Sequence, residues 1–412
     1  MKRLITPAVF LLCVFSISAQ ITQWRGPDRD GQFPGTGLLK VWPENGPQQV
    51  LEVDHLGKGY SSPIVTSDAI YVTGMKDTLD YLTKLSLDGK LQWQVPYGRS
   101  WDQSYPETRA SATVDGNRVY VQSGMGRVAC INTADGKEIW AVEVDKVFET
   151  VYHSWGNSET PLIYKNMVIV TPAGKKTSVV ALNKMTGALV WETKPVGGPR
   201  SYVSPTIYTW KNFTYILAAT GTHLIAVNPE NGDIAWTYKY LDPKISDDDA
   251  LIWADTPVFK DDEIFITMGY NYPAVMLKMA EDGRSVSVKY KNNTLDNHHH
   301  GVILYNGYLY GSDWINNSQG KWVCMNWDTG KIMYETGWET KGDIIMADGM
   351  LYCYNERGSV GLVKPDPNEF KVVSQFKIRK GSGPHWAHPF IAGGKLYIRH
   401  GEVLLAYNLK AL

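Results

Sequence analysis

The sequence has few cysteines, no excess of charge of either sign, and no long apolar run after its N-terminal residues. Four cysteines occur in 412 residues, none adjacent and none spaced as Cys-x-x-Cys, so neither a zinc site nor a thioredoxin-like redox pair is indicated. Lys plus Arg number 41 against 42 for Asp plus Glu, which removes the electrostatic basis for a dedicated nucleic-acid binder. No membrane span is predicted in the mature chain.

The N-terminus has the pattern of an export signal. Two basic residues precede an apolar run over 7–17 that is too short to cross a bilayer, and small residues offer a cleavage site before Gln20. Residues 1–19 are therefore predicted to be a signal peptide, in preference to an N-terminal anchor. The mature chain is expected in the periplasm or outside the cell. Cys13 follows a Leu instead of a small residue, which argues against a lipid anchor.

What the sequence has in abundance is Gly, Trp and Tyr, arranged in a repeat. Four segments carry Gly-x-x-x-Trp after a short apolar stretch, beginning at Gly89, Gly136, Gly187 and Gly232. Two more, at Gly283 and Gly330, keep the spacing without the Trp, and a seventh has Asn368 in the Gly position. Successive motifs are about 40–50 residues apart, which is the spacing of a repeated supersecondary unit.

Each repeat has the pattern of four short strands. In the second repeat, strands are predicted over 112–114, 119–122, 127–132 and 138–142, joined in two places by Asp-Gly turns. Four-stranded units at this spacing are typical of a β-propeller. The predicted fold class is therefore all-β, an eight-bladed β-propeller with four-stranded antiparallel blades.

The last repeat lacks its fourth strand. It begins at His388, contains apolar runs over 395–400 and 403–408, and then the chain stops. Because a spare strand at 48–54 precedes the first repeat, this N-terminal strand is predicted to complete the last blade and close the ring. The predicted organisation is a signal peptide over 1–19, a segment over 20–47 packed on the propeller, and the propeller over 48–412.

The repeat also assigns structural roles. The repeated Trp residues are expected to pack between neighbouring blades. Cys130 and Cys324 occupy a third-strand position where other repeats have Ala181 and Ala226, so they are interpreted as small buried residues in opposite blades, unable to bond to each other. With Cys353 they make an odd number, which excludes full pairing within the chain.

Three consecutive repeats resemble those of a known family, the pyrroloquinoline-quinone (PQQ) type propellers. The segments that carry the resemblance are 128–132 with 136–140, 180–183 with 187–191, and 225–228 with 232–236. The opening Trp24-Arg25-Gly26-Pro27, with Asp30-Gly31, is similar to the start of exported bacterial proteins with that propeller. The family includes quinoprotein alcohol dehydrogenases and the propeller lipoprotein of the outer-membrane assembly machine.

The resemblance implies the fold over nearly the whole mature chain, but the sequence departs from both kinds of relative. The dehydrogenases typically carry an adjacent-cysteine disulfide over the quinone and a calcium site of Glu, Asn and Asp. This chain has no adjacent cysteines and no such triad that a motif can locate, so PQQ stays an open cofactor assignment. The assembly lipoprotein is lipid-anchored, and the motif for that anchor is missing here.

The loops that lead into the innermost strands are long, as at 96–108, 144–157 and 240–254, whereas the turns at the other end are short. Function is therefore expected at one mouth of the central channel. Aligning the first strands places eight residues at one equivalent position: Tyr60, Arg109, Ser158, Tyr202, Ala254, His299, Lys341 and Trp386. Two residues later, on the same face, are Ser62, Ser111, Thr160, Ser204, Thr256, Gly301, Asp343 and His388.

Two interpretations of these polar rows are open. One is a water-filled funnel in which Ser and Thr cap strand ends, and the other is a binding pocket. The candidate binding residues are Tyr60, Arg109, His153, Trp155, Tyr202, Trp253, Asp255, His299, His300, Asp343, His385, Trp386 and His388. A glycan, a small molecule or an envelope protein is expected as the partner in preference to a metal, because three successive His in a strand would alternate faces. No catalytic residue is assigned.

Two functions are compatible with these patterns. The first is an exported binding or scaffold propeller without catalysis, supported by the lack of a Ser-His-Asp order, a phosphate loop or a dinucleotide fingerprint. The alternative is a quinone-dependent alcohol or sugar dehydrogenase, an oxidoreductase in which Arg109 and the funnel aromatics hold the quinone.

Overall fold

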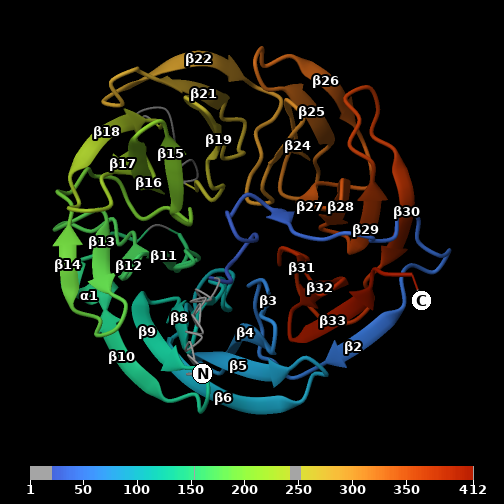
Figure 1. Cartoon of the computed structure of the whole chain (residues 1–412), viewed down its shortest axis with the longest axis horizontal. Coiled ribbons are helices and arrows are strands. Elements are labelled where there is room, and N and C mark those ends of the chain that lie inside the picture. Colours follow the sequence, from blue (N-terminus) through green and yellow to red (C-terminus); the bar gives the residue numbers. More distant parts are fainter. Residues whose placement is uncertain (1–20, 153, 242–251, 412) are drawn as a thin grey trace, which may run out of the picture.

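The computed structural model describes residues 21–152, 154–241 and 252–411, and these residues form a ring of eight β-sheets around a central axis (Figure 1). The predicted signal peptide, His153 and most of the loop over 240–254 lie outside the described residues. The eight-bladed propeller is confirmed, and successive sheets follow one another around the ring in chain order. No helix of the described residues is long and apolar enough to cross a membrane.

Within each blade, successive strands are antiparallel neighbours from the channel outward. Blade one contains β3 (Ile64–Val65), β4 (Ala69–Lys76), β5 (Leu79–Ser86) and β6 (Leu91–Arg99). Blade two contains β7 (Thr113–Asp115), β8 (Arg118–Gln122), β9 (Arg127–Asn132) and β10 (Glu138–Glu143), followed by the short helix α1 (Val144–Phe148). Blade three contains β11 (Leu162–Tyr164), β12 (Met167–Val170), β13 (Val180–Asn183) and β14 (Leu189–Glu192). Blade four contains β15 (Thr206–Trp210), β16 (Phe213–Ala219), β17 (His223–Val227) and β18 (Ile234–Lys239).

The second half of the ring repeats this order. Blade five contains β19 (Val258–Lys260), β20 (Glu263–Ile266), β21 (Ala274–Met279) and β22 (Val286–Asn292). Blade six contains β23 (Ile303–Tyr305), β24 (Tyr308–Ser312), β25 (Trp322–Asn326) and β26 (Ile332–Thr336). Blade seven contains β27 (Gly342–Ala347), β28 (Met350–Asn355), β29 (Ser359–Val363) and β30 (Val372–Lys377). Blade eight contains β31 (Phe390–Ala392), β32 (Lys395–His400), β33 (Val403–Asn408) and β2 (Gln49–Val53).

The N-terminal strand closes the ring as predicted. β2 pairs antiparallel with β33, with Leu51 opposite Ala406 and Val53 opposite Leu404. The last blade therefore combines strands from both ends of the described chain, and the ring has no open blade edge at its junction. This pairing joins strands more than three hundred residues apart in the sequence. Loss of β2 would therefore expose the edge of β33 and open the ring.

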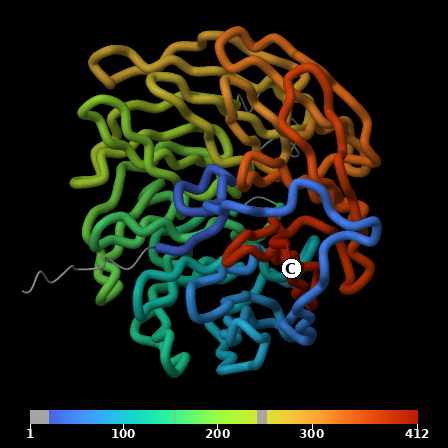
Figure 2. The backbone as a smooth tube through the Cα atoms, turned by 45° about the vertical axis from the view of Figure 1, so that its right-hand side comes forward, coloured from blue at the N-terminus to red at the C-terminus, as the bar shows by residue number. Residues whose placement is uncertain are grey.

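A fifth strand adds to blade seven, where only four were predicted. β1 (Gln32–Phe33) pairs in parallel with the innermost strand, with Gln32 opposite Met346. In Figures 1 and 2 the blue N-terminal segment crosses the ring and then runs outward to β2. The segment over 20–47 was predicted to pack on the propeller, and part of its described length enters the channel.

The repeated Gly and Trp form the contact between neighbouring blades. Gly187 has a φ of 75°, and a Cβ atom there would lie 2.7 Å from the ring of Trp140 in the preceding blade. The Trp140 indole N–H donates to the carbonyl of Lys184, 3.0 Å away in the same turn. The same arrangement joins Trp93 to Gly136 and Trp191 to Gly232. The Gly is therefore needed both for its left-handed backbone and for the space that the neighbouring ring fills.

The three described cysteines are buried and free, as expected for small residues that pack within blades. Cys130 lies on β9, Cys324 on β25 and Cys353 on β28, so they belong to blades two, six and seven.

Replacing Trp191 tests the blade contact. Trp191 is 7% exposed, so Trp191→Ala is expected to lower the free energy of unfolding by about 3–5 kcal/mol, because it empties a slot between two blades. Leu189→Ala on the same strand is the matched control, since Leu189 is 50% exposed and should change the value by no more than about 0.5 kcal/mol. Urea denaturation measures both, and an equal loss in the two variants would contradict the packing role.

Candidate functional site

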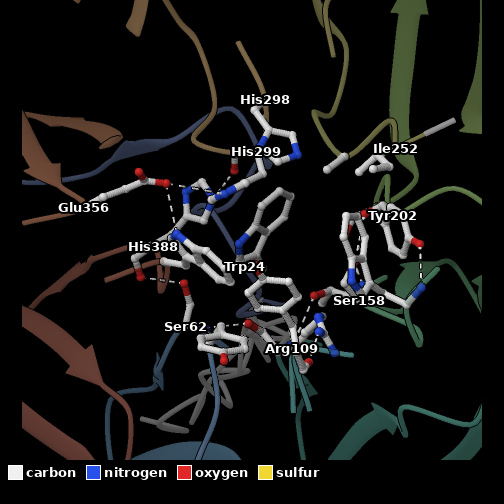
Figure 3. A pocket seen from close by; sticks show the side chains of 18 of the residues that line it. Trp24, Ser62, Arg109, Ser158, Tyr202, Ile252, His298, His299, Glu356 and His388 are labelled. Carbon is white, nitrogen blue, oxygen red and sulfur yellow. Dashed lines mark hydrogen bonds and ion pairs between the residues drawn. The ribbon is translucent and has the colours of Figure 1, made fainter. Parts of the chain in front are cut away.

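A cavity of about 360 Å³ lies at the mouth of the channel where the long loops lead into the innermost strands. All eight residues of the first aligned position line it, one from each blade: Tyr60, Arg109, Ser158, Tyr202, Ala254, His299, Lys341 and Trp386. Figure 3 shows the labelled side chains approaching a common centre from all sides. The repeat alignment thus located the wall of the cavity, because equivalent positions of eight blades meet around one axis.

The second aligned position lies deeper and links the blades. The backbone N–H of Ser62 donates to Ser111 Oγ at 2.9 Å, and that of Ser111 donates to Thr160 Oγ1 at 3.2 Å. The Thr160 N–H donates in turn to Ser204 Oγ at 3.0 Å. These hydroxyls form a belt of hydrogen bonds across four blades. At this second position the Ser and Thr side chains therefore cap strand ends, as in the first of the two interpretations.

The N-terminal segment closes the channel below the cavity. Trp24 lines the cavity and lies in the middle of the view in Figure 3, between Arg109 and His299. Behind it, Arg29 donates to the carbonyls of Thr160 and Pro161, at 3.0 and 2.6 Å. The buried guanidinium of Arg29 needs such hydrogen-bond acceptors because burying an unpaired charge is costly. The cavity is therefore a dead end.

Arg25 occupies the opposite side of the closed channel and faces blades six to eight. Its Nη1 lies 3.2 Å from His388 Nδ1 and donates to the carbonyl of Ile344 at 3.4 Å. Burial lowers the pKa of Arg25, while the charges of Asp255 and Asp343 oppose that shift. Burial raises the pKa of Asp255 to about 7 and raises that of Asp343 well above its usual range.

Glu356 is the one carboxylate among the described residues that line the cavity. It accepts from Trp386 Nε1 at 2.9 Å and lies 3.2 Å from His300 Nε2 and 2.9 Å from Lys341 Nζ. Burial alone would raise the pKa of Glu356, but the contacts with His300 and Lys341 outweigh it and lower the pKa to about 2. Glu356 is therefore ionised, and its charge is compensated within the protein.

The expectation that successive His residues point to opposite faces was wrong. Residues 298–300 precede β23 and do not lie in a strand, and the rings of His299 and His300 lie side by side, with centroids 4.0 Å apart and planes tilted by 36°. Ligand atoms of His299, His300 and Glu356 lie within 4.8 Å of one another. Lys341 shares the same carboxylate, however, and a cation beside an ammonium group is electrostatically disfavoured.

The candidate residues from the sequence fall into three groups. Those that line the cavity are Tyr60, Arg109, Trp155, Tyr202, His299, Trp386 and His388. Those that lie behind it, buried and away from the open space, are Trp253, Asp255, His300 and Asp343. Trp253 packs in a hydrophobic cluster shared by blades four and five and donates to the Asp255 carbonyl, so the structure corrects its placement.

Two candidates remain. His385 stacks on His400, with ring centroids 3.7 Å apart, outside the cavity lining. Its placement is also corrected, because the side chain of His385 lies outside the cavity whereas that of its neighbour Trp386 lines it. His153 lies outside the described residues.

The sequence reasoning missed lining residues from a second class of loop. Tyr270, Trp314 and Glu356 all lie in connections between the second and third strands of their blades, which reach the same mouth as the long loops. Aligning those connections across the repeats, as was done for the first strands, is the signal that would have found them. Trp24 was noticed only as part of a family resemblance.

The cavity does not fit a quinone held with calcium. Ca²⁺ takes six to eight oxygen ligands, whereas the lining offers one carboxylate that three donors already occupy. The described cysteines lie within blade strands, away from the lining. The lining rings of Tyr105, Trp155 and Trp386 meet at 46° and 80°, which makes a faceted wall instead of parallel faces for a flat ring system.

Comparison with known proteins gives three kinds of likeness. A protein family described as outer membrane protein assembly factor BamB matches residues 80–336. A curated relative, the outer membrane protein assembly factor BamB of Alkalilimnicola ehrlichii, is 24% identical over 181 residues, which is 43% of this chain and 42% of the relative. The matched region therefore spans less than half of that relative.

Solved structures show the same fold. The crystal structure of BamB from Moraxella catarrhalis superposes with a TM-score of 0.62 at 15% identity, covering 88% of this chain and 99% of that one. A europium-containing methanol dehydrogenase superposes with a TM-score of 0.60 at 13% identity, covering 86% and 85%. At these identities the likeness is one of fold.

The raised pKa of Asp255 gives a pH test of the closed channel. Because the folded state favours the protonated acid, the stability that this group contributes is present below about pH 4 and is lost as the pH rises to 7. Between pH 4 and 7, the free energy of unfolding of Asp255→Asn should therefore fall less, or rise more, than that of the wild type.

Urea denaturation at four pH values across this range measures the difference. The pKa values of Asp296 and Glu159 are also raised to about 7 by burial, but both groups titrate in wild type and variant alike, so their effects cancel in the comparison. Parallel curves for the two proteins would show that Asp255 does not titrate as its burial requires.

Proposed function

Because this chain belongs to the family described as outer membrane protein assembly factor BamB, we propose that it is a scaffold of the cell envelope that binds a partner at the open mouth of its channel and catalyses no reaction. The observation that carries the proposal is the dead-end cavity. One side chain from each blade surrounds its open mouth, while Trp24, Arg25 and Arg29 occupy the channel behind it. A cavity closed at one end favours binding of a partner over passage of a molecule through the channel.

The chemistry of the lining supports binding without catalysis. The hydroxyls of Ser111, Thr160 and Ser204 accept hydrogen bonds from backbone N–H groups of neighbouring blades. They therefore link the blades structurally and are not paired with a general base. Glu356 is ionised and compensated, which is a poor state for a general acid. The His rings of the lining are held neutral by burial, which lowers the pKa values of His299 and His388.

The predicted signal peptide and the family both support an envelope location. The family name supports a protein as the partner, by analogy with an assembly factor. The rim offers a place for such contact, since Tyr105 lines the cavity and is 54% exposed.

Site-directed photocrosslinking in cells tests the binding face. A photoreactive amino acid at Tyr105 is expected to give a defined adduct with one envelope protein, and the same adduct should form between the two purified proteins. The matched control is Leu91, which is 62% exposed on the outermost strand of blade one and should give no such adduct. Equal labelling at both positions would contradict a partner at the mouth.

A turnover assay tests the absence of catalysis. The purified protein is mixed with PQQ and calcium, and dye reduction is followed with several alcohols and sugars. No turnover is expected, because the lining provides neither the calcium ligands nor parallel rings. Sustained dye reduction that depends on PQQ would overturn the proposed function.

A further inference from the structure

The cavity contains one cation whose hydrogen-bonding capacity the protein leaves open. Two cations, Arg109 and Lys341, are among the described residues that line it. Lys341 Nζ pairs with Glu356 and donates to the carbonyls of Asn316 and Asn317, each at 2.9 Å, which uses all three of its N–H groups. Its charge and its donors are therefore satisfied within the protein.

Arg109 differs in both respects. Its guanidinium donates to the backbone carbonyls of Glu107 and Tyr105, and no carboxylate of the described residues lies within ion-pair distance of it, although the charges of Asp80 and Glu107 act on it from outside the lining. A guanidinium has five N–H donors in a planar fork, so donors remain for a ligand. With Lys341 and Glu356 compensating each other and the His rings neutral, the lining carries a net positive charge centred on Arg109.

An arc of aromatic rings surrounds this cation. Tyr60 contacts Trp386, Trp386 contacts Tyr105, Tyr105 contacts Trp155, and Trp155 contacts Tyr202, with ring centroids 5.1 to 6.2 Å apart. Arg109 Cζ lies 5.8 Å from the centre of the Tyr60 ring. Neighbouring rings in the arc meet at 46° to 80°, so the wall is faceted and curved.

The far wall adds polar groups to the rings of Tyr270 and Trp314, which pack beside His298. His298 and His299 face Arg109 across the cavity in Figure 3, and Glu356 lies beside them. Neutral imidazoles can donate at one nitrogen and accept at the other, which suits ligand hydroxyls. The cavity therefore combines an anion receptor, apolar facets and hydroxyl partners within a volume typical of small-ligand sites, roughly 300–1,000 Å³.

We propose that this cavity binds a sugar ring that carries a carboxylate, such as a uronic acid residue of an acidic glycan. Arg109 pairs with the carboxylate, the C–H faces of the ring pack on the aromatic arc, and the ring hydroxyls bond to the far wall. A pyranose ring is puckered and amphipathic, so a faceted aromatic wall matches it, whereas a flat quinone requires parallel faces. This assignment goes beyond the proposed scaffold role and does not depend on the identity of the protein partner.

The test compares ligands that differ only at the carboxylate. Methyl glycosides of glucuronic, galacturonic and mannuronic acid are titrated into the full chain by calorimetry, each beside its neutral glucoside, galactoside or mannoside. At least one acid is expected to bind about 10-fold or more tightly than its neutral counterpart, since a charge-assisted hydrogen bond contributes about 1.5–3 kcal/mol.

Two variants link the preference to the cavity. Arg109→Gln should abolish the preference for the acid, and Arg109→Lys should keep only part of it, because an ammonium lacks the fork geometry. Arg379→Gln, which removes an exposed arginine away from the lining, should leave binding unchanged. Circular dichroism of Arg109→Gln checks that the fold is retained.

The opposing outcomes are distinct. Equal binding of acids and neutral sugars, binding of PQQ alone, or an acid preference that survives Arg109→Gln in a folded variant would each overturn the assignment. Failure of every sugar to bind would overturn it as well. The scaffold role would not fall with it, because crosslinking at Tyr105 tests that role separately.

Discussion

The contact between neighbouring blades is the constraint on which the rest of the molecule depends. Each blade is a small sheet that cannot bury both faces alone, so the glycine turn of one blade packs against a large side chain of its neighbour, a Trp at three junctions and Phe213 or Tyr290 at two others. Because this contact is repeated around a circle, the ring must close, and β2 closes it by pairing with β33. The innermost strands are then held around one axis, and their equivalent positions must meet there.

The N-terminal segment converts a channel into a cavity. Two arginines, Arg25 and Arg29, are buried there, and the backbone carbonyls of several blades accept their hydrogen bonds. Innermost strands suit this role because their channel-facing edges carry unpaired carbonyl groups. The segment therefore caps strand edges and at the same time gives the binding space its floor, Trp24.

The lining departs from the symmetry of the scaffold. Blades one to four and blade eight contribute the aromatic arc and Arg109, whereas blades six and seven contribute two imidazoles, Trp314 and the compensated pair of Lys341 and Glu356. A rigid eightfold frame thus presents two chemically different walls, which is what recognition of an asymmetric ligand requires. Elaborated loops on one face and short turns on the other restrict this variation to a single mouth.

The sequence alone determined the number of blades, the closing strand and the row of eight residues that line the cavity. These follow from spacing, because a repeat of fixed period maps equivalent residues to equivalent places. Only the tertiary structure decided which neighbouring residues face the open space. Trp253 and His385 lie close in sequence to lining residues, yet the side chain of Trp253 packs in a hydrophobic cluster shared by blades four and five, and that of His385 stacks on His400. Arg25 and Trp24 join the site across long sequence separations, through a terminal segment that has no counterpart in the repeat, and no periodic pattern can specify such contacts.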